Sequence, residues 1–267
     1  MKKIGLIAGG GKLPLLLSKE ANKNGTKIFA AAISEYASPQ LKNEVEEIKW
    51  LRVGEFEQIA GFFKSCGISL VAMIGVVPQS LLLNRADFDD RINSLLSQLE
   101  IKQTESVLGA IASELSREGI ELIDSRKYLS AFLPQPGVLT KRKPTERELK
   151  DIELGRKILR EISPLDIGQT ILIKNGIILS IEAIEGTDSC IHRGAILAKS
   201  GAVIVKMSKS RQDMRFDIPV VGAKTLTLMR KVKAAILAIE KEKVIVLDKE
   251  KAVKIANEAG ISIVVYE

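Results

Sequence analysis

Residues 3–14 read KIGLIAGGGKLP, an apolar run that ends in three consecutive glycines. The run has the length and composition of a buried strand, and Pro14 suits the first turn of a helix. The glycines therefore form a turn between a strand and a helix, where backbone N–H groups can approach an anion. A tight turn without a ligand is the alternative. The candidate ligand contacts in this turn are Gly10, Gly11, Lys12 and Leu13.

The glycine spacing is neither GxGxxG nor GxxxxGK[ST], so it matches neither the dinucleotide fingerprint nor the Walker loop. Glu35, after the second apolar run, could stand in for the acid that binds a ribose in nicotinamide-dependent enzymes. A nicotinamide-dependent oxidoreductase, or another nucleotide-binding Rossmann protein, is therefore an alternative function. Residues 75–85 follow the fourth run and would open at the same sheet edge, which makes Gln79 and Arg85 further candidate contacts.

Five apolar runs alternate with amphipathic stretches over the first half of the chain. The runs are KIGLIA, KIFAAAI, VEEIKWL, ISLVAMIG and IELID. Between them lie stretches such as LPLLLSKEANKNG, EFEQIAGFFKSCG and ESVLGAIASELSREG. This alternation predicts an α/β domain over residues 1–133, with helices that cover a parallel sheet.

The second half of the chain has a different order of predicted elements. Pro134, Pro136 and Pro144 mark a connection, so we expect a linker and connecting helix over 134–164 and a second domain over 165–267. Asn175-Gly176 between apolar runs predicts a β-hairpin. A helix from about Thr187, an extended stretch at 211–222, a long helix from about Thr225 and a closing strand-helix-strand complete an α+β domain.

Composition limits the class of protein. The chain has 267 residues, 46% of them hydrophobic, which is ample for two buried cores. No run approaches the roughly 20 apolar residues of a membrane span, and two distant cysteines without CxxC spacing argue against zinc. We therefore expect a cytoplasmic protein. With a single histidine, His192, any metal would be held by oxygen, which indicates Mg²⁺ or Mn²⁺.

The formal charge of +7 lies wholly in the second half of the chain. This bias suits an anionic partner, such as a phosphate, a nucleic acid or a membrane surface. Nucleic acid is disfavoured because aromatic residues make up only 4% of the chain and acids are interspersed among the bases.

Two loops of the second half carry acids beside a glycine: Glu185 to Asp188, and residues 211–222, which read RQDMRFDIPVVG. If the second is extended, Asp213, Arg215 and Asp217 share one face, either as an exposed ion-pair ladder or as a site for a cation and a phosphate. Candidate oxygen ligands are Glu185, Asp188, Asp213 and Asp217. Bases that could neutralise phosphate are Arg193, Lys206, Lys209, Arg211 and Arg215.

Each of these loops also has a simpler interpretation. Thr187 or Asp188 could cap the helix that follows, which would need no ligand. His192, four positions after Asp188, is expected to have a packing or surface role rather than a catalytic one.

IEAIEGTDSCIHRGAIL, MSKSRQDMRFDIPVVGAKT and GLIAGGGKLP together resemble the magnesium-dependent UDP-2,3-diacylglucosamine pyrophosphatases of the lipid A pathway, over essentially the full length. These enzymes are unrelated to calcineurin-like metallophosphoesterases. The resemblance implies hydrolysis of UDP-2,3-diacylglucosamine to UMP and 2,3-diacylglucosamine 1-phosphate. It also implies a Rossmann-like N-terminal domain, a distinct C-terminal domain and a homodimer. Peripheral contact with the cytoplasmic face of the inner membrane is left open.

The resemblance also assigns roles to residues. It puts the catalytic centre on Asp213, Arg215 and Asp217, with Mg²⁺, or Mn²⁺ in its place, on a set drawn from Asp213, Asp217 and Asp188. Which aspartate binds the metal and which orients water stays open. Substrate contacts are expected from Gly186, Thr187, Asp188, Arg193, Lys206, Gln212 and Thr225, together with the glycine turn and Gln79.

Overall fold

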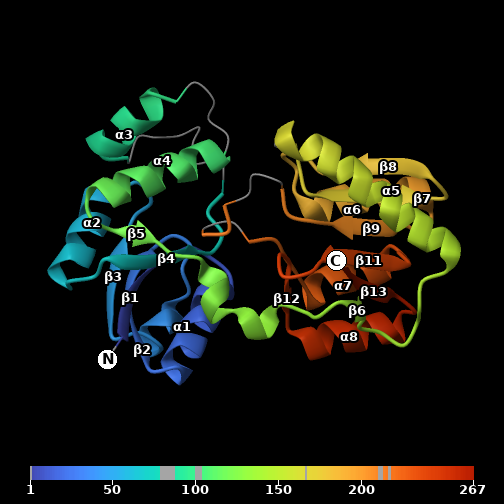
Figure 1. The fold of residues 1–267 in the computed structure, drawn as a ribbon, viewed down its shortest axis with the longest axis horizontal. Coiled ribbons are helices and arrows are strands. Elements are labelled where there is room, and N and C mark those ends of the chain that lie inside the picture. Colours follow the sequence, from blue (N-terminus) through green and yellow to red (C-terminus); the bar gives the residue numbers. More distant parts are fainter. Residues whose placement is uncertain (1, 79–87, 100–103, 166, 210–212, 216–217) are drawn as a thin grey trace. The chain divides into compact units, whose positions relative to one another are not determined.

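The computed structural model describes all residues except 1, 79–87, 100–103, 166, 210–212 and 216–217. Two compact units can be distinguished (Figure 1). Unit 1 comprises Met1–Ser130 and Asp213–Asp217, and unit 2 comprises Ala131–Gln212 and Ile218–Glu267. Each unit has its own sheet and its own core.

Unit 1 is built on a five-stranded sheet in the order β3-β2-β1-β4-β5, with every pair parallel. Its strands are β1 (Lys2–Ala8), β2 (Thr26–Ile33), β3 (Glu47–Leu51), β4 (Leu70–Ile74) and β5 (Glu121–Leu122). The strand order reverses between β1 and β4, as in doubly wound nucleotide-binding folds. The parallel sheet expected for the first half is confirmed.

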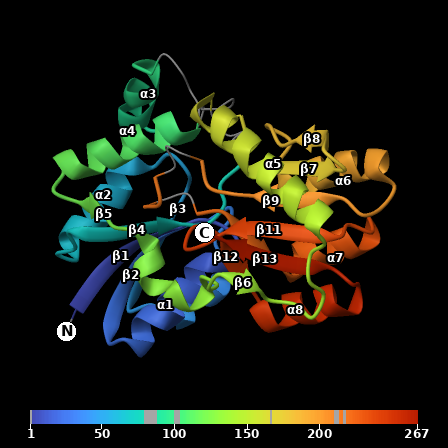
Figure 2. The same ribbon diagram turned by 45° about the vertical axis from the view of Figure 1, so that its right-hand side comes forward.

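Helices cover both faces of this sheet (Figures 1 and 2). The helix α1 covers one face, while α2, α3 and α4 pack on the other around Phe63, Leu96 and Leu115. Gly5 of β1 lets Phe63 approach, because a Cβ atom at Gly5 would lie 2.7 Å from the Phe63 ring. The helices are α1 (Leu13–Lys23), α2 (Phe56–Ser65), α3 (Asp90–Ser97) and α4 (Thr104–Arg117), with short 3₁₀ turns at Pro39–Asn43, Ser125–Tyr128 and Ser130–Phe132.

Unit 2 has a separate mixed sheet in the order β6-β13-β11-β9-β7-β8. The central strands β13, β11 and β9 are parallel, and β6, β7 and β8 are antiparallel to their neighbours. The strands are β6 (Gly137–Val138), β7 (Thr170–Lys174), β8 (Ile177–Ile181), β9 (Val203–Lys206), β11 (Ile236–Glu240) and β13 (Ser262–Tyr266). A parallel pair, β10 (Val220–Gly222) and β12 (Ile245–Leu247), lies beside it in the same unit.

Helices also cover both faces of the second sheet. The helix α5 packs on one face through Ile152 and Leu159, and α6, α7 and α8 pack on the other. Thr145 begins α5 with a capping box that includes Glu148. The helices are α5 (Glu146–Ile162), α6 (Thr187–Ala198), α7 (Ala223–Lys231) and α8 (Lys249–Glu258), and a 3₁₀ turn spans Ser163–Leu165.

Several local expectations can be compared with this unit. The hairpin at Asn175-Gly176 is confirmed, and both residues have positive φ, as a type I′ turn requires. The helix expected from Thr187 is also confirmed. The helix expected near Thr225 is shorter than predicted, since α7 has nine residues. The stretch 134–164 contributes β6 and α5 to unit 2.

Candidate functional site

In unit 2, a buried polar cluster lies where β9 ends and α6 begins. Lys206, the last residue of β9, is 4% exposed, and its Nζ donates to Thr187 Oγ1 at 2.6 Å. The Thr187 hydroxyl donates in turn to Glu182 Oε1 at 2.9 Å. Glu182 is itself buried, and its Oε2 has no hydrogen-bond partner among the described residues. The end of β9 and the segment that joins β8 to α6 therefore fix one hydroxyl between a cation and a carboxylate.

The strand register explains this meeting. Thr170 of β7 pairs with Lys206 of β9, and the Thr170 carbonyl accepts the Glu182 N–H at 2.8 Å. Side chains alternate along a strand, and Ile204 belongs to the core under α6, so Lys206 points to the same face. Gly168 permits the close packing, because a Cβ atom there would lie 2.0 Å from the Glu182 carbonyl oxygen.

The start of α6 differs from the simpler interpretation of the sequence. The N-cap is Gly186, at φ 79° and ψ 168°, and no side chain caps the helix. The expectation that Thr187 or Asp188 caps α6 is wrong, because both lie inside the first turn and Thr187 bonds to Lys206 and Glu182. A helix without a side-chain cap presents its first N–H groups to a ligand or to water.

The other predicted contacts around α6 have different partners. Asp188 pairs with Lys224 of α7 at 3.1 Å, and Arg193 pairs with Glu185 at 2.5 Å. The Arg193 guanidinium lowers the pKa of Glu185, and that carboxylate raises the pKa of Arg193. Thr225 lies in the first turn of α7. A cavity of about 510 Å³ separates the two helices and is lined by Asp188, Ser189, His192, Lys224, Thr227, Leu228 and Lys231.

In unit 1, Asp213 and Arg215 form a local clamp. The Arg215 backbone N–H donates to Asp213 Oδ1 at 3.0 Å, and its Nε and Nη2 donate to the same carboxylate at 2.9 and 2.5 Å. Arg215 thereby lowers the pKa of Asp213, and Asp213 raises the pKa of Arg215. The extended ladder predicted here is wrong for the described residues, because Met214 and Arg215 form a turn.

The glycine turn after β1 is shaped by packing against the loop after β4. Gly9 donates to the Ile74 carbonyl, and Gly10 and Val76 exchange both backbone hydrogen bonds. A Cβ atom at Gly9 would lie 2.9 Å from the carbonyl carbon of Gly75. Gly11 has φ 86° and no atom that would hinder a Cβ within 4 Å. Gly10, Gly11, Lys12 and Leu13 thus lie where β1 meets α1.

The remaining predicted contacts divide into residues outside the described ranges and Glu35, whose carboxylate has local partners. Asp217, Gln79, Gln212, Arg85 and Arg211 lie outside the described residues. Glu35 accepts from Ser34 Oγ and from the Val53 N–H at 3.3 Å, so its carboxylate holds the local loop.

The described parts of the chain contain no group of three His, Cys, Asp or Glu side chains that could hold a metal ion. The candidate ligands Asp213 and Asp188 belong to different units, and each has a cationic partner. A metal held entirely by described side chains is therefore not supported. One or two carboxylates are enough for Mg²⁺ when substrate phosphates supply the other ligands.

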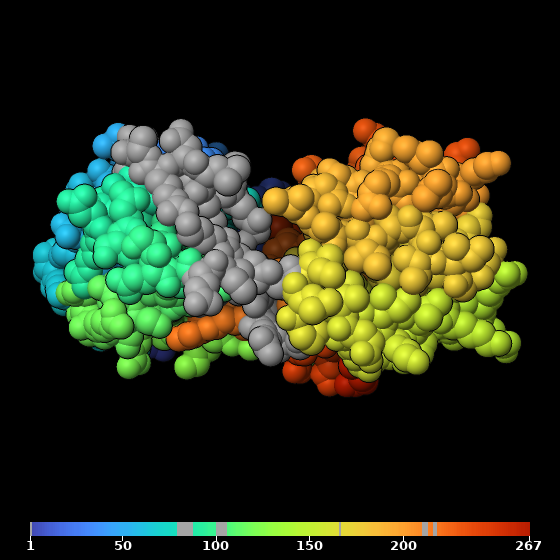
Figure 3. Space-filling view, turned by 90° about the horizontal axis from the view of Figure 1, so that it is seen from above, coloured from blue at the N-terminus to red at the C-terminus, as the bar shows by residue number. Residues whose placement is uncertain are grey.

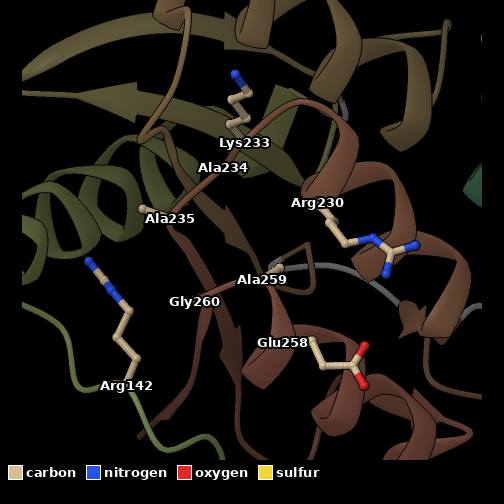
Figure 4. A pocket seen from close by; sticks show the side chains of 8 residues that line it. All are labelled: Arg142, Arg230, Lys233, Ala234, Ala235, Glu258, Ala259 and Gly260. Atoms are coloured by element: carbon tan, nitrogen blue, oxygen red, sulfur yellow. The ribbon is translucent and has the colours of Figure 1, made fainter.

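A second cavity of unit 2, of about 350 Å³, lies beside the segments that precede β11 and β13 (Figure 4). It is lined by Arg142, Arg230, Lys233, Ala234, Ala235, Glu258, Ala259 and Gly260. The charged side chains in Figure 4 do not converge on one point. Arg230 lies in the last turn of α7, where a cation stabilises the helix dipole.

Comparison with known proteins assigns the chain to a family. The model of the LpxI N-terminal domain matches residues 3–132, and that of the LpxI C-terminal domain matches residues 135–264. The chain belongs to the LpxI family. This LpxI-family chain is 29% identical over 258 residues to the UDP-2,3-diacylglucosamine pyrophosphatase LpxI of Caulobacter vibrioides, covering 91% of its own length and 89% of that protein.

Solved structures similar to this LpxI-family chain are more distant. An N5-carboxyaminoimidazole ribonucleotide synthetase from Thermotoga maritima is 15% identical over 68% of the chain, with a TM-score of 0.29. A phosphoribosylglycinamide synthetase from Anaerococcus prevotii is 12% identical over 72% of the chain, with a TM-score of 0.28. The chain spans 41% and 42% of these two proteins.

Proposed function

We propose that this protein hydrolyses the diphosphate of UDP-2,3-diacylglucosamine and acts in lipid A biosynthesis. The observation that carries the proposal is the curated relative, whose name states this activity and which matches 91% of the chain. The LpxI N-terminal and C-terminal domain models match consecutive parts of the chain, so both kinds of domain are represented in it. The EGTD and QDMRFDIPVVG motifs, which resemble those of UDP-2,3-diacylglucosamine pyrophosphatases, imply the same activity.

The reaction adds water across one phosphoric anhydride bond. A water oxygen bonds to one phosphorus, the bridging P–O bond breaks, and UMP and 2,3-diacylglucosamine 1-phosphate leave. The protein must neutralise the phosphoryl oxygens and position the attacking water. In the proposal, the clamped guanidinium of Arg215 contacts a phosphate oxygen, and the Asp213 carboxylate holds that guanidinium in place.

A second anion contact is proposed in unit 2. Lys206 and the first N–H groups of α6 offer a positive charge and directed donors, which are the features that bind phosphate. Gly186 and Thr187 supply the backbone for this contact. Asp188 and Arg193, which pair with Lys224 and Glu185, are proposed to act at its border.

Mg²⁺, with Mn²⁺ as a substitute, is proposed as the cofactor. Asp213 is the candidate ligand among the described residues, and Asp217 and Asp188 remain candidates from the sequence. Bound metal would supply charge neutralisation at the phosphoryl oxygens. Asp213 suits this role because Arg215 keeps its carboxylate ionised below the usual range of an aspartate pKa.

The lipid part of the substrate implies an apolar contact surface. Within the described ranges, no helix is long and apolar enough to cross a membrane. The hairpin β7–β8 and α6 come to the surface of unit 2 in Figure 3, coloured yellow to light orange, and their exposed apolar side chains include Ile177, Ile178, Ile196 and Leu197. We propose peripheral membrane contact and a homodimer, to be tested by vesicle flotation and by light scattering.

The nicotinamide-dependent alternative is not favoured. Glu35, the proposed ribose acid, is occupied by Ser34 and the Val53 backbone. A nicotinamide-dependent activity would also leave the acids and bases of the second half without a role.

The deciding experiment incubates the purified protein with UDP-2,3-diacylglucosamine and Mg²⁺ and separates the nucleotides by chromatography. UMP should form in a 1:1 ratio with the lipid monophosphate. Release of UDP in place of UMP would move the cleavage to the sugar-phosphate bond, and no nucleotide release would contradict the proposal.

A further inference from the structure

The Asp213–Arg215 clamp has a second copy in the same unit. Asp124, Ser125 and Arg126 follow β5 and repeat the spacing of an aspartate two positions before an arginine. The Arg126 backbone N–H donates to Asp124 Oδ1 at 2.9 Å. The Arg126 Nε and Nη2 donate to the same carboxylate at 3.0 and 2.6 Å. Atom for atom, these are the bonds that join Arg215 to Asp213.

The two clamps are in contact. Ser125 is fully buried, and its Oγ donates to the Arg215 carbonyl at 3.4 Å and to the Met73 carbonyl at 3.5 Å. Met73 lies near the end of β4, so the paired clamps are at the carboxyl edge of the first sheet. In open α/β sheets this is the edge at which ligands bind.

Fold stability does not explain two such clamps. The side chains of Arg126 and Asp124 are 28% and 39% exposed, and exposed ion pairs typically contribute only about 0–1 kcal/mol. The bond from Asp124 to the Arg126 N–H begins a 3₁₀ turn, but that bond does not require the guanidinium to bind as well. What the clamp achieves is a fixed orientation of a planar group that otherwise has many rotamers.

An arginine fixed in this way is suited to a phosphate. The guanidinium has five N–H donors in a rigid fork, and the carboxylate engages one edge of it. Since each aspartate balances the charge of its arginine, recognition depends on directed donors more than on long-range attraction. Two such forks, carried by segments that are linked through the Ser125 hydroxyl, suit a ligand with two adjacent phosphates.

We infer that Arg126 is a second diphosphate-binding arginine, oriented by Asp124 as Arg215 is oriented by Asp213. The inference rests on the proposed function for the identity of the substrate. Asp124 is then a positioning residue, which acts only through Arg126.

The test measures UMP release and the binding of inorganic diphosphate, the latter by calorimetry, for Arg126→Ala, Arg126→Lys and Asp124→Asn. Arg126→Ala should lower kcat/KM by about 10- to 100-fold, the loss expected for one hydrogen-bonded charge, and should weaken diphosphate binding. Arg126→Lys keeps the charge without the fork and should recover less than half of that loss on a logarithmic scale. The matched control is Arg117→Ala, which removes an arginine that is 73% exposed and paired with Glu114 in the same unit.

A positioning role gives Asp124→Asn a distinctive result. It should lower kcat/KM in the parent background and have no further effect in the Arg126→Ala background, because the two residues act as one unit. Equal effects in both backgrounds, or kcat/KM and diphosphate binding within about twofold of the parent for Arg126→Ala, would overturn the inference. If the parent binds diphosphate but releases no UMP, the proposed function fails, and the binding comparison alone still decides the role of Arg126. If Arg126→Ala does not fold, Arg126→Lys and Asp124→Asn decide the role of Arg126. A loss of kcat/KM and of diphosphate binding in both variants supports the inference, and values within about twofold of the parent in both overturn it.

Discussion

At the scale of single residues, a substitution at Asp213 can separate its contribution to folding from its proposed contribution to turnover. Its carboxylate accepts four hydrogen bonds from Arg215 and is 30% exposed, so this ion pair contributes little to folding. Asp213→Asn should reduce UMP release by about 10² or more, as for other positioned acid-base groups. Its melting temperature at pH 7 should stay near that of the parent. Turnover within twofold of the parent would show that Asp213 and Arg215 form only a surface ion pair with no role in the reaction.

The pH dependence of the same pair has a definite sign. Because Arg215 lowers the pKa of Asp213, the folded carboxylate stays ionised below the pKa of an unfolded aspartate, about 3.9. The stability from this pair is therefore present above that value and is lost as pH falls through the folded pKa. Any difference in melting temperature between the parent and Asp213→Asn should therefore be small at pH 7 and should vanish as pH falls through the folded pKa of Asp213. A difference that grows with acidity would contradict this assignment.

Thr187 tests the buried cluster of unit 2. Thr187→Val keeps the shape of the side chain, but it takes an acceptor from Lys206 and a donor from Glu182. The free energy of unfolding should fall by about 1–3 kcal/mol, since buried charged groups lose hydrogen bonds, and kcat/KM should fall with it. Thr187→Ser retains the hydroxyl and should remain close to the parent in urea titration and turnover.

At the scale of elements, the β1–α1 turn shows why its glycines are needed. Gly9 and Gly75 cross so closely that a Cβ atom on Gly9 would meet backbone atoms, which cannot rotate away. Gly9→Ala should therefore lower the free energy of unfolding by about 1–3 kcal/mol. Gly61→Ala is the matched control: it lies inside α2 with open space around it, and the change should stabilise by about 0.5–1 kcal/mol. Equal shifts in denaturant midpoint would contradict the packing argument.

Sequence reasoning succeeded where structure is determined locally. The residue pair Asn175-Gly176 predicts its hairpin because few residues adopt positive φ at two consecutive positions. It failed at Arg215, because the Asp213 carboxylate accepts the Arg215 backbone N–H two residues further on and so forms a turn in a stretch whose residue pattern suits a strand. The meeting of Lys206, Thr187 and Glu182 depends on strand register across the sheet, which no local pattern reveals. The repeated Asp-x-Arg spacing could have drawn attention to Arg126.

At the scale of the whole molecule, the division of the sequence differs from the division of the structure. The chain leaves unit 2 after Gln212, contributes Asp213 to unit 1, and returns to unit 2 at Ile218. An acid from the second half therefore belongs with the strands of the first half. A fragment of residues 131–267 lacks the Ser125 contact to Arg215 and should show no turnover in the UMP assay. Turnover at the rate of the intact chain would show that unit 1 is dispensable.

Activity is expected to require a metal ion that binds together with the substrate phosphates. The described residues contain no cluster of three ligands, and Mg²⁺ is commonly held by one or two carboxylates together with substrate phosphates. We therefore expect metal and nucleotide to bind together: Mg²⁺ alone should leave the melting temperature almost unchanged, whereas Mg²⁺ with UDP should raise it above the value with UDP alone. EDTA should abolish UMP release, and Mg²⁺ or Mn²⁺ should restore it. A large thermal shift with Mg²⁺ alone would indicate a complete protein site, and full turnover in EDTA would exclude a metal requirement.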